Sequence, residues 1–142
     1  MQDLLTIQSM LHAYGDFCEC VVETVIWSDY GATVSVTLDY VWEGDLVRSG
    51  GPKRLVTLEF SLVQEVTMVN AFPPPAIADP SLINWSHNEV SIVKVGSDER
   101  SKRYNTGGVE FFHAKFLREE NCWIDIVFGS LTISEAGTVV SR

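Results

Sequence analysis

A histidine, an aspartate and two cysteines fall within nine residues near the start of the chain, in LHAYGDFCECVVETVIW (residues 11–27). Two cysteines at i and i+2 on a strand point to the same side, so Cys18 and Cys20 could offer thiolates to zinc, together with His12 or Asp16. The rest of that face is apolar, and no fourth ligand is evident. Free cysteine usually packs as a small apolar group. We therefore expect both cysteines to begin the core face of a strand, with no metal or other cofactor bound.

Two further histidines, His87 and His113, could each act as a general base beside a carboxylate such as Glu89, Glu110 or Asp125. The chain has no serine in a nucleophile elbow, no glycine-rich phosphate loop and no His-Glu-x-x-His pattern. Asp125 lies between two isoleucines of an apolar strand and is expected on its solvent face. The sequence thus favours a protein that is not an enzyme, with catalysis at one of these histidines as an alternative.

The first elements are a helix and a strand. Apolar residues recur at helical spacing from Leu4 to Tyr14, with Asp3 placed to cap the start and Gly15 to end the helix. From Phe17 the period changes from 3.6 to 2, which indicates a strand. We expect the helix to cover one face of a sheet.

A second strand, TVSVTLDYVW, follows the first through SDYGA. If residues 29–31 form a three-residue loop, Gly31 takes its left-handed position, Ser28 pairs with Ala32, and even-numbered residues face even-numbered residues. Tyr40 and Trp42 then lie on the core face. The outer face of this hairpin is predicted to carry acids, namely Glu19, Glu23 and Asp39.

The remaining chain alternates as strands with short connections, apart from the proline-rich NAFPPPAIADPSLINWS, which predicts an extended loop. The charged DERSKR (residues 98–103) predicts a solvated hairpin tip. No repeat, heptad or βαβ alternation is visible. The chain is predicted to be a single domain over residues 1–142, of α+β and mainly β class, with one N-terminal helix packed on an antiparallel sheet of about seven strands.

The charge is unevenly distributed. Residues 1–47 contain eight acids and no Lys or Arg, whereas residues 48–142 carry eleven acids and ten bases. An acidic block of this kind argues against nucleic acid as a partner and favours a basic protein. No apolar run approaches the roughly 20 residues of a membrane helix, and no secretory signal is recognisable. Three cysteines suit a reducing compartment, so a cytoplasmic location is expected.

Two binding sites are candidates. Aromatic residues ringed by charge are typical of protein interfaces, although the acids could also serve solubility alone. The alternative is a small-molecule pocket between the sheet and the proline-rich loop, near Phe72, Trp85 and Phe112. The candidate partner-binding residues of the first hairpin are Glu19, Glu23, Trp27, Asp29, Tyr30, Asp39, Glu43 and Asp45.

Residues 4–66 carry a family resemblance. The junction Tyr14, Gly15 and Asp16, followed by VVETVIW, VSVTLDYVW and VTLEFSLVQEV, resembles small bacterial immunity proteins of polymorphic or contact-dependent toxin systems. Some members carry Phe-His-Asp at this junction, where this chain has Tyr-Gly-Asp. The resemblance implies a stoichiometric inhibitor of a cognate toxin and no catalysis. A basic toxin, such as a nuclease, would suit the acidic surface.

Overall fold

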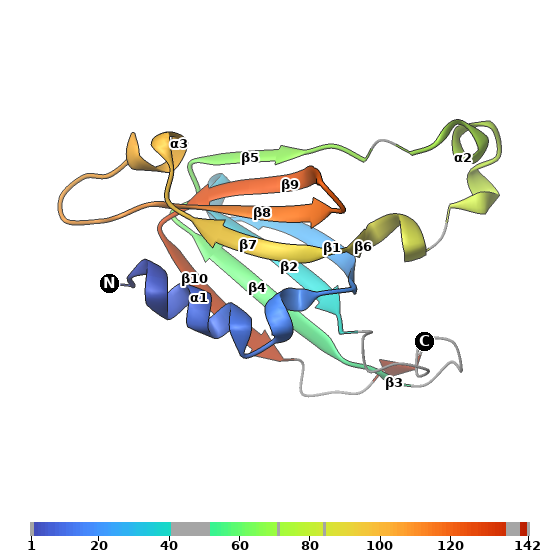
Figure 1. Cartoon of the computed structure of the whole chain (residues 1–142), viewed down its shortest axis with the longest axis horizontal. Helices are drawn as coiled ribbons and strands as arrows, with labels where there is room; N and C mark the ends of the chain where they lie inside the picture. The colour runs from blue at the N-terminus through green and yellow to red at the C-terminus, as the bar shows by residue number, and fades with distance from the viewer. Residues whose placement is uncertain (1, 41–51, 71, 84, 136–139, 142) are drawn as a thin grey trace.

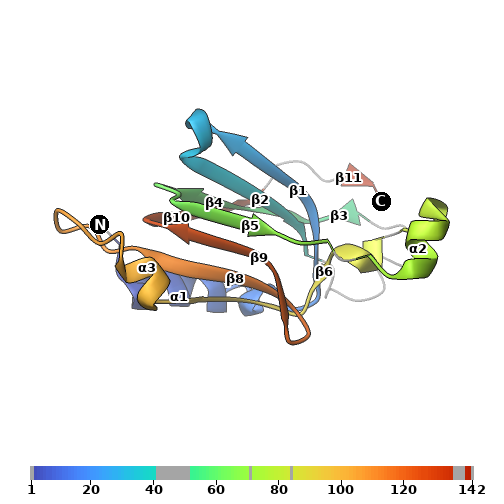
Figure 2. The same cartoon turned by 90° about the horizontal axis from the view of Figure 1, so that it is seen from above.

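The computed structural model describes residues 2–40, 52–70, 72–83, 85–135 and 140–141. It confirms the α+β, mainly β class, but the strands form two facing antiparallel sheets instead of one (Figures 1 and 2). The five-stranded sheet has the order β10 (Ser130–Glu135), β4 (Leu55–Ser61), β2 (Thr33–Asp39), β1 (Cys20–Ser28) and β6 (Glu89–Val90). The four-stranded sheet has the order β5 (Glu65–Met68), β9 (Asn121–Phe128), β8 (Phe112–Arg118) and β7 (Ile92–Gly96).

The smaller elements lie outside these sheets. Strands β3 (Pro52–Lys53) and β11 (Val140–Ser141) pair only with each other. The α-helices are α1 (Leu4–His12), α2 (Pro74–Ala78) and α3 (Glu99–Lys102). Among the described residues, no helix has the length and apolarity that crossing a membrane requires.

The chain crosses between the two sheets at four places: after β4, through the proline-rich segment between β5 and β6, at Ser91 and at Gly129. At the first, Leu62 adopts a φ of 54°. At the last, a Cβ on Gly129 would lie 2.9 Å from Leu62 Cδ1, so a larger side chain does not fit without movement. The alternating segments around Ser91 and Gly129 are therefore each divided between the two sheets.

Helix α1 closes one open side between the sheets (Figure 1). The carboxylate of Asp3 accepts a hydrogen bond from the Thr6 amide at 2.8 Å, which confirms the predicted N-cap. Gln2 donates to the carbonyl of Leu131 in β10, and Gln8 donates to a carbonyl in β7. The helix thus bridges the end strands of the two sheets.

The core lies between the sheets and contains side chains from both. Phe60 of β4 packs edge-on against Phe128 of β9, with ring centroids 4.9 Å apart, and also against Phe116 of β8. Phe112 completes this group and is fully buried. Because one hydrophobic cluster joins both sheets and α1, the described chain forms a single domain.

The proline-rich segment folds differently from our prediction. Instead of an extended loop, it contains the short helix α2, which begins just after Pro73, and two helical turns. Proline is tolerated in the first turn of a helix, where the backbone N–H has no intrahelical partner. The run of prolines therefore starts a helix here.

Candidate functional site

The two N-terminal cysteines do not share a face. Cys20 is buried in the core, whereas Cys18 is exposed and precedes β1. Three of residues 16–19 have positive φ, so the chain is not yet extended at Cys18, and our expectation of a core position is wrong for that residue. His12 Nδ1 instead pairs with Asp16 Oδ1 at 2.7 Å. Within the described ranges, no group of three or more His, Cys, Asp or Glu residues could hold a metal ion.

The loop of the first hairpin is strained. Asp29, Tyr30 and Gly31 all have positive φ, at 52°, 58° and 90°, which confirms the left-handed position predicted for Gly31. The Thr33 hydroxyl donates to the Asp29 carboxylate at 2.9 Å and braces the loop. Non-glycine residues in this region cost energy and persist where the surroundings enforce them. The result is a tyrosine held fully exposed at the tip of the loop.

A β-bulge at Glu23 overturns the pairing that we predicted for this hairpin. Val22 pairs with Leu38, but Thr24 pairs with Thr37, and Ser28 pairs with Thr33 instead of Ala32. One extra residue exchanges the two faces of a strand. Beyond the bulge, Val25 and Trp27 therefore lie on the inner face, opposite Val36 and Val34, while Thr24 and Ile26 lie on the outer face.

The predicted acidic residues do not form one shared face. Glu19, Glu23 and Asp29 are exposed, but Asp39 is only 4% exposed and cannot belong to an accessible patch. Glu43, Asp45 and the core position predicted for Trp42 lie outside the described residues. Glu89 of β6 pairs with Val21 near the start of β1. Burial, together with the negative charge of Glu19, raises the pKa of Glu89.

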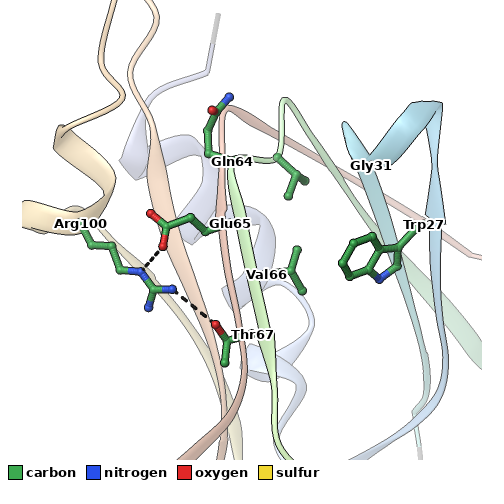
Figure 3. Close-up of a pocket in the computed structure, with 8 residues that line it drawn as sticks. Trp27, Gly31, Gln64, Glu65, Val66, Thr67 and Arg100 are labelled. Atoms are coloured by element: carbon green, nitrogen blue, oxygen red, sulfur yellow. Dashed lines mark hydrogen bonds and ion pairs between the residues drawn. The ribbon is translucent and has the colours of Figure 1, made fainter.

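Trp27 is exposed, as predicted, even though it points to the inner face. Trp27 is 60% exposed because it lies beside the loop at the tip of the hairpin. Figure 3 shows the indole and the side chain of Val66 in β5 pointing toward one another across a hollow. Glu65 and Thr67 point the other way, toward Arg100 (Figure 3). Trp27 therefore faces β5 of the other sheet.

The charged residues near α3 form a closed network. His113 is 6% exposed, and its ring nitrogens lie 2.8 Å from an oxygen of Asp98 and 3.2 Å from an oxygen of Asp125. Asp125 is on the outer face of its sheet, but its side chain is only 15% exposed, so our solvent-face expectation is wrong as to exposure. Because carboxylates engage both ring nitrogens, neither is available to a substrate.

Arg100 extends this network on the same face. Its guanidinium contacts Asp125 at 2.9 Å and Glu65 at 2.8 Å, and Tyr104 donates to the second oxygen of Glu65 at 2.5 Å. The hydrogen bonds from Tyr104 and Arg100 lower the pKa of Glu65. Residues 98–103, predicted as a solvated hairpin tip, instead start α3 through a capping box at Asp98 and hold Arg100 against the sheet.

The alternative ligand pocket is also rearranged. Phe112 is fully buried between the sheets, and the side chain of Trp85 lies outside the described part of the chain. Phe72 does line a hollow of about 380 Å³, together with Trp123 and residues of β1. His87 lies beside Phe72, with ring centroids 5.7 Å apart. Phe72 and Phe112 therefore do not line one pocket, although a hollow exists beside Phe72.

Trp123 is a residue that our sequence reasoning missed. It is the extra residue in a second bulge, where Phe116 pairs with Ile124 but Leu117 pairs with Cys122. Arg118 stacks on its ring at 4.6 Å and donates to the carbonyls of Asn70 and His87, at the two ends of the proline-rich segment. Two-residue alternation does not reveal such a bulge, because the pattern resumes on both sides of it.

Comparison with known proteins adds only the fold. No family model and no curated protein matches the chain. A solved structure, described as that of an uncharacterized protein from Neisseria gonorrhoeae, aligns with a TM-score of 0.54 and 11% sequence identity. The alignment covers 82% of this chain and 90% of that chain. The likeness supports the α+β arrangement.

Proposed function

We propose that this chain is a non-catalytic, protein-binding inhibitor of immunity type that neutralises a basic partner protein, such as a nuclease toxin, in the cytoplasm. The observation that carries the proposal is the exposure of two aromatic side chains, Trp27 and Tyr30, on a hairpin whose charged residues are all acidic. Exposed aromatics in a charged surround match the composition of protein interfaces.

The rigidity of the hairpin also supports binding. Tyr30 is held by a loop of left-handed residues, and β1 pairs with β2 from Val21 to Ser28, apart from the bulge at Glu23. A preorganised aromatic side chain loses little conformational entropy when a partner covers it. The negative charge of the region would accelerate association with a basic protein and make the rate depend on salt.

A small-molecule binding domain is the second candidate. It is favoured by the hollow beside Phe72 and Trp123, whose volume of about 380 Å³ suits a small ligand. A ligand bound there would raise the melting temperature with little dependence on ionic strength. A thermal-shift screen of small metabolites, repeated at low and high salt, tests this candidate.

Affinity capture with charge variants tests the inhibitor proposal. The tagged wild-type chain is incubated with an extract of the cells that produce it, at about 50 mM and about 300 mM salt. We expect one basic protein to be retained stoichiometrically, and more weakly at the higher salt. The variant Glu19→Lys/Glu23→Lys/Asp29→Lys should lose it. Asp39 is left unchanged because it is buried.

The matched control is Glu110→Lys/Glu119→Lys/Glu120→Lys, which changes three exposed acids outside the hairpin and alters the net charge equally. It should retain the partner. If both variants lose the partner equally, the effect depends on net charge alone and not on the hairpin. If the wild-type chain retains no basic protein, the proposal is overturned. For the toxin assignment, expression of the captured protein alone should arrest growth, and co-expression of this chain should restore it.

A further inference from the structure

One edge of β1 is available for pairing over most of its length. On the side away from β2, β1 pairs with β6 only at Cys20 and Val21. Among the described residues, no strand pairs with residues 23–28 on that side. Strand β5 is likewise the last strand of its sheet. Such edges present unpaired N–H and C=O groups, which form a template for an added strand.

The free edge of β1 borders a groove. One hollow of about 390 Å³ lies between Trp27, Gly31 and the start of β5, and Phe72 lines the second, of about 380 Å³, at the end of β5. Both hollows are lined by Trp27. The two hollows therefore form a groove along β1 and β5.

The rims of this groove are apolar and exposed. On β1, Trp27 is 60% exposed, and at the end of β5, Met68 is 48% exposed. An exposed apolar edge strand is an aggregation hazard in an isolated protein. The exposed apolar edge of β1 is best explained by another molecule that covers it.

Charge identifies the occupant. Asp29 lies at one end of the free edge, and residues 1–47 carry eight acids and no Lys or Arg. A second copy of the chain, with its net charge of -9, would bring the same acids against each other. A segment that carries lysine or arginine would relieve this repulsion.

We infer that the edge of β1 binds an extended, basic segment of the partner protein, which adds a strand to the five-stranded sheet beside residues 24–28. Alternate side chains of this segment point to opposite sides. Apolar ones enter the groove against Trp27 and Val66, and basic ones remain outside, near Asp29. Strand addition at the edge of β1 rests on the proposed function and specifies how the hairpin would bind the partner protein.

The test uses synthetic peptides and the unmodified protein. The probe is acetyl-Lys-Val-Lys-Val-Lys-Val-Lys-amide, and the controls are Glu-Val-Glu-Val-Glu-Val-Glu and a block peptide with the four lysines before the three valines. We expect saturable binding of the probe only, with slower hydrogen exchange of amides in residues 24–28. Amides of β5 should not be protected to the same degree.

Backbone methylation separates strand pairing from charge attraction. Two probes are N-methylated, one at the valines and one at lysines 3 and 5. Because alternate residues of an added strand face the edge, one methylated probe should bind at least about tenfold more weakly than the other. Equal binding of both methylated probes, or binding of the block peptide as tightly as the probe, would overturn strand addition.

The remaining outcomes also decide the question. Absence of binding at millimolar probe would contradict the inference, and so would a dimer in sedimentation with the same β1 amides protected, because a second copy would then be the occupant. Failure here is separable from failure of the proposed function. If a basic protein is captured through the hairpin acids but the peptides do not bind, the proposed inhibitor function stands and strand addition at β1 is rejected.

Discussion

The first hairpin and the network around α3 are both rich in charge, but they use it in opposite ways. Near α3, Asp98, His113, Asp125, Arg100 and Glu65 satisfy one another, and these side chains are largely buried or in contact with the sheet. On the hairpin, acids lie beside exposed aromatic groups with no base in the surrounding sequence. Internally compensated charge contributes to folding, whereas charge of one sign on a surface acts on other molecules.

Matched Asp→Asn substitutions give the largest test of this comparison. Asp125→Asn removes the carboxylate that contacts both Arg100 and His113, and we expect the free energy of unfolding to fall by about 2 kcal/mol. Asp29→Asn keeps a side chain that tolerates positive φ and can accept from Thr33, so we expect a change within about 0.5 kcal/mol. Urea denaturation measures both. Equal losses would show that the hairpin acids are structural as well.

The pH dependence of stability should have opposite signs in the two regions. The lowered pKa of Glu65 means that its contribution is present above its ordinary value of 4.5 and is lost as the pH falls through its folded pKa. The raised pKa of Glu89 means that its contribution is present below 4.5 and is lost as the pH rises through its folded pKa.

Two glutamine variants check these signs. Glu89→Gln should be more stable than the wild type at pH 7, and this gain should vanish as the pH falls toward 4. Glu65→Gln should be less stable at pH 7, and its deficit should shrink below about pH 4.5. The stability contribution of Asp98 should depend on pH in the same direction as that of Glu65. Burial raises the pKa of Asp98, but the hydrogen bonds with His113 and Ser101 outweigh burial and leave this pKa lowered. Thermal unfolding between pH 3 and 8 measures these differences in stability from the wild type. A difference that changes with pH in the opposite direction would contradict the assignment.

Two tyrosines provide the smallest test. Tyr30→Asn removes a fully exposed ring from a left-handed position that asparagine tolerates, so the melting temperature should change by no more than about 2 °C. Partner affinity should nevertheless fall at least about tenfold. Tyr104→Phe removes the hydroxyl bonded to Glu65, so it should lower the melting temperature and leave affinity unchanged. The reverse result would assign recognition to the α3 side.

The sequence predicted what depends on local periodicity and missed what depends on single extra residues. The cap at Asp3, the left-handed Gly31 and the exposure of Tyr30 in the loop follow from residue type and spacing. The bulge at Glu23 does not, because a strand with one inserted residue still alternates on each side of it.

The second sheet was missed for a related reason. A strand that turns a corner at Gly129 reads as one continuous alternating run, and only tertiary packing against Leu62 shows where it changes sheet. The network of His113, Asp98 and Asp125 was equally hidden, because its members are distant in sequence and meet only through the pairing of β8 with β9 and the placement of α3.

The four crossings between the sheets have a consequence for how the molecule folds. Strands that are neighbours in space are far apart in the chain: Ser130 of β10 pairs with Ser61 of β4, and Glu65 of β5 pairs with Val127 of β9. Closing such distant pairs is slow, so folding on a timescale of about milliseconds to seconds is expected. During synthesis β1 and β2 emerge before every strand of the four-stranded sheet. The hairpin that we assign to recognition is therefore the pair of strands that remains longest without the facing sheet that completes its core.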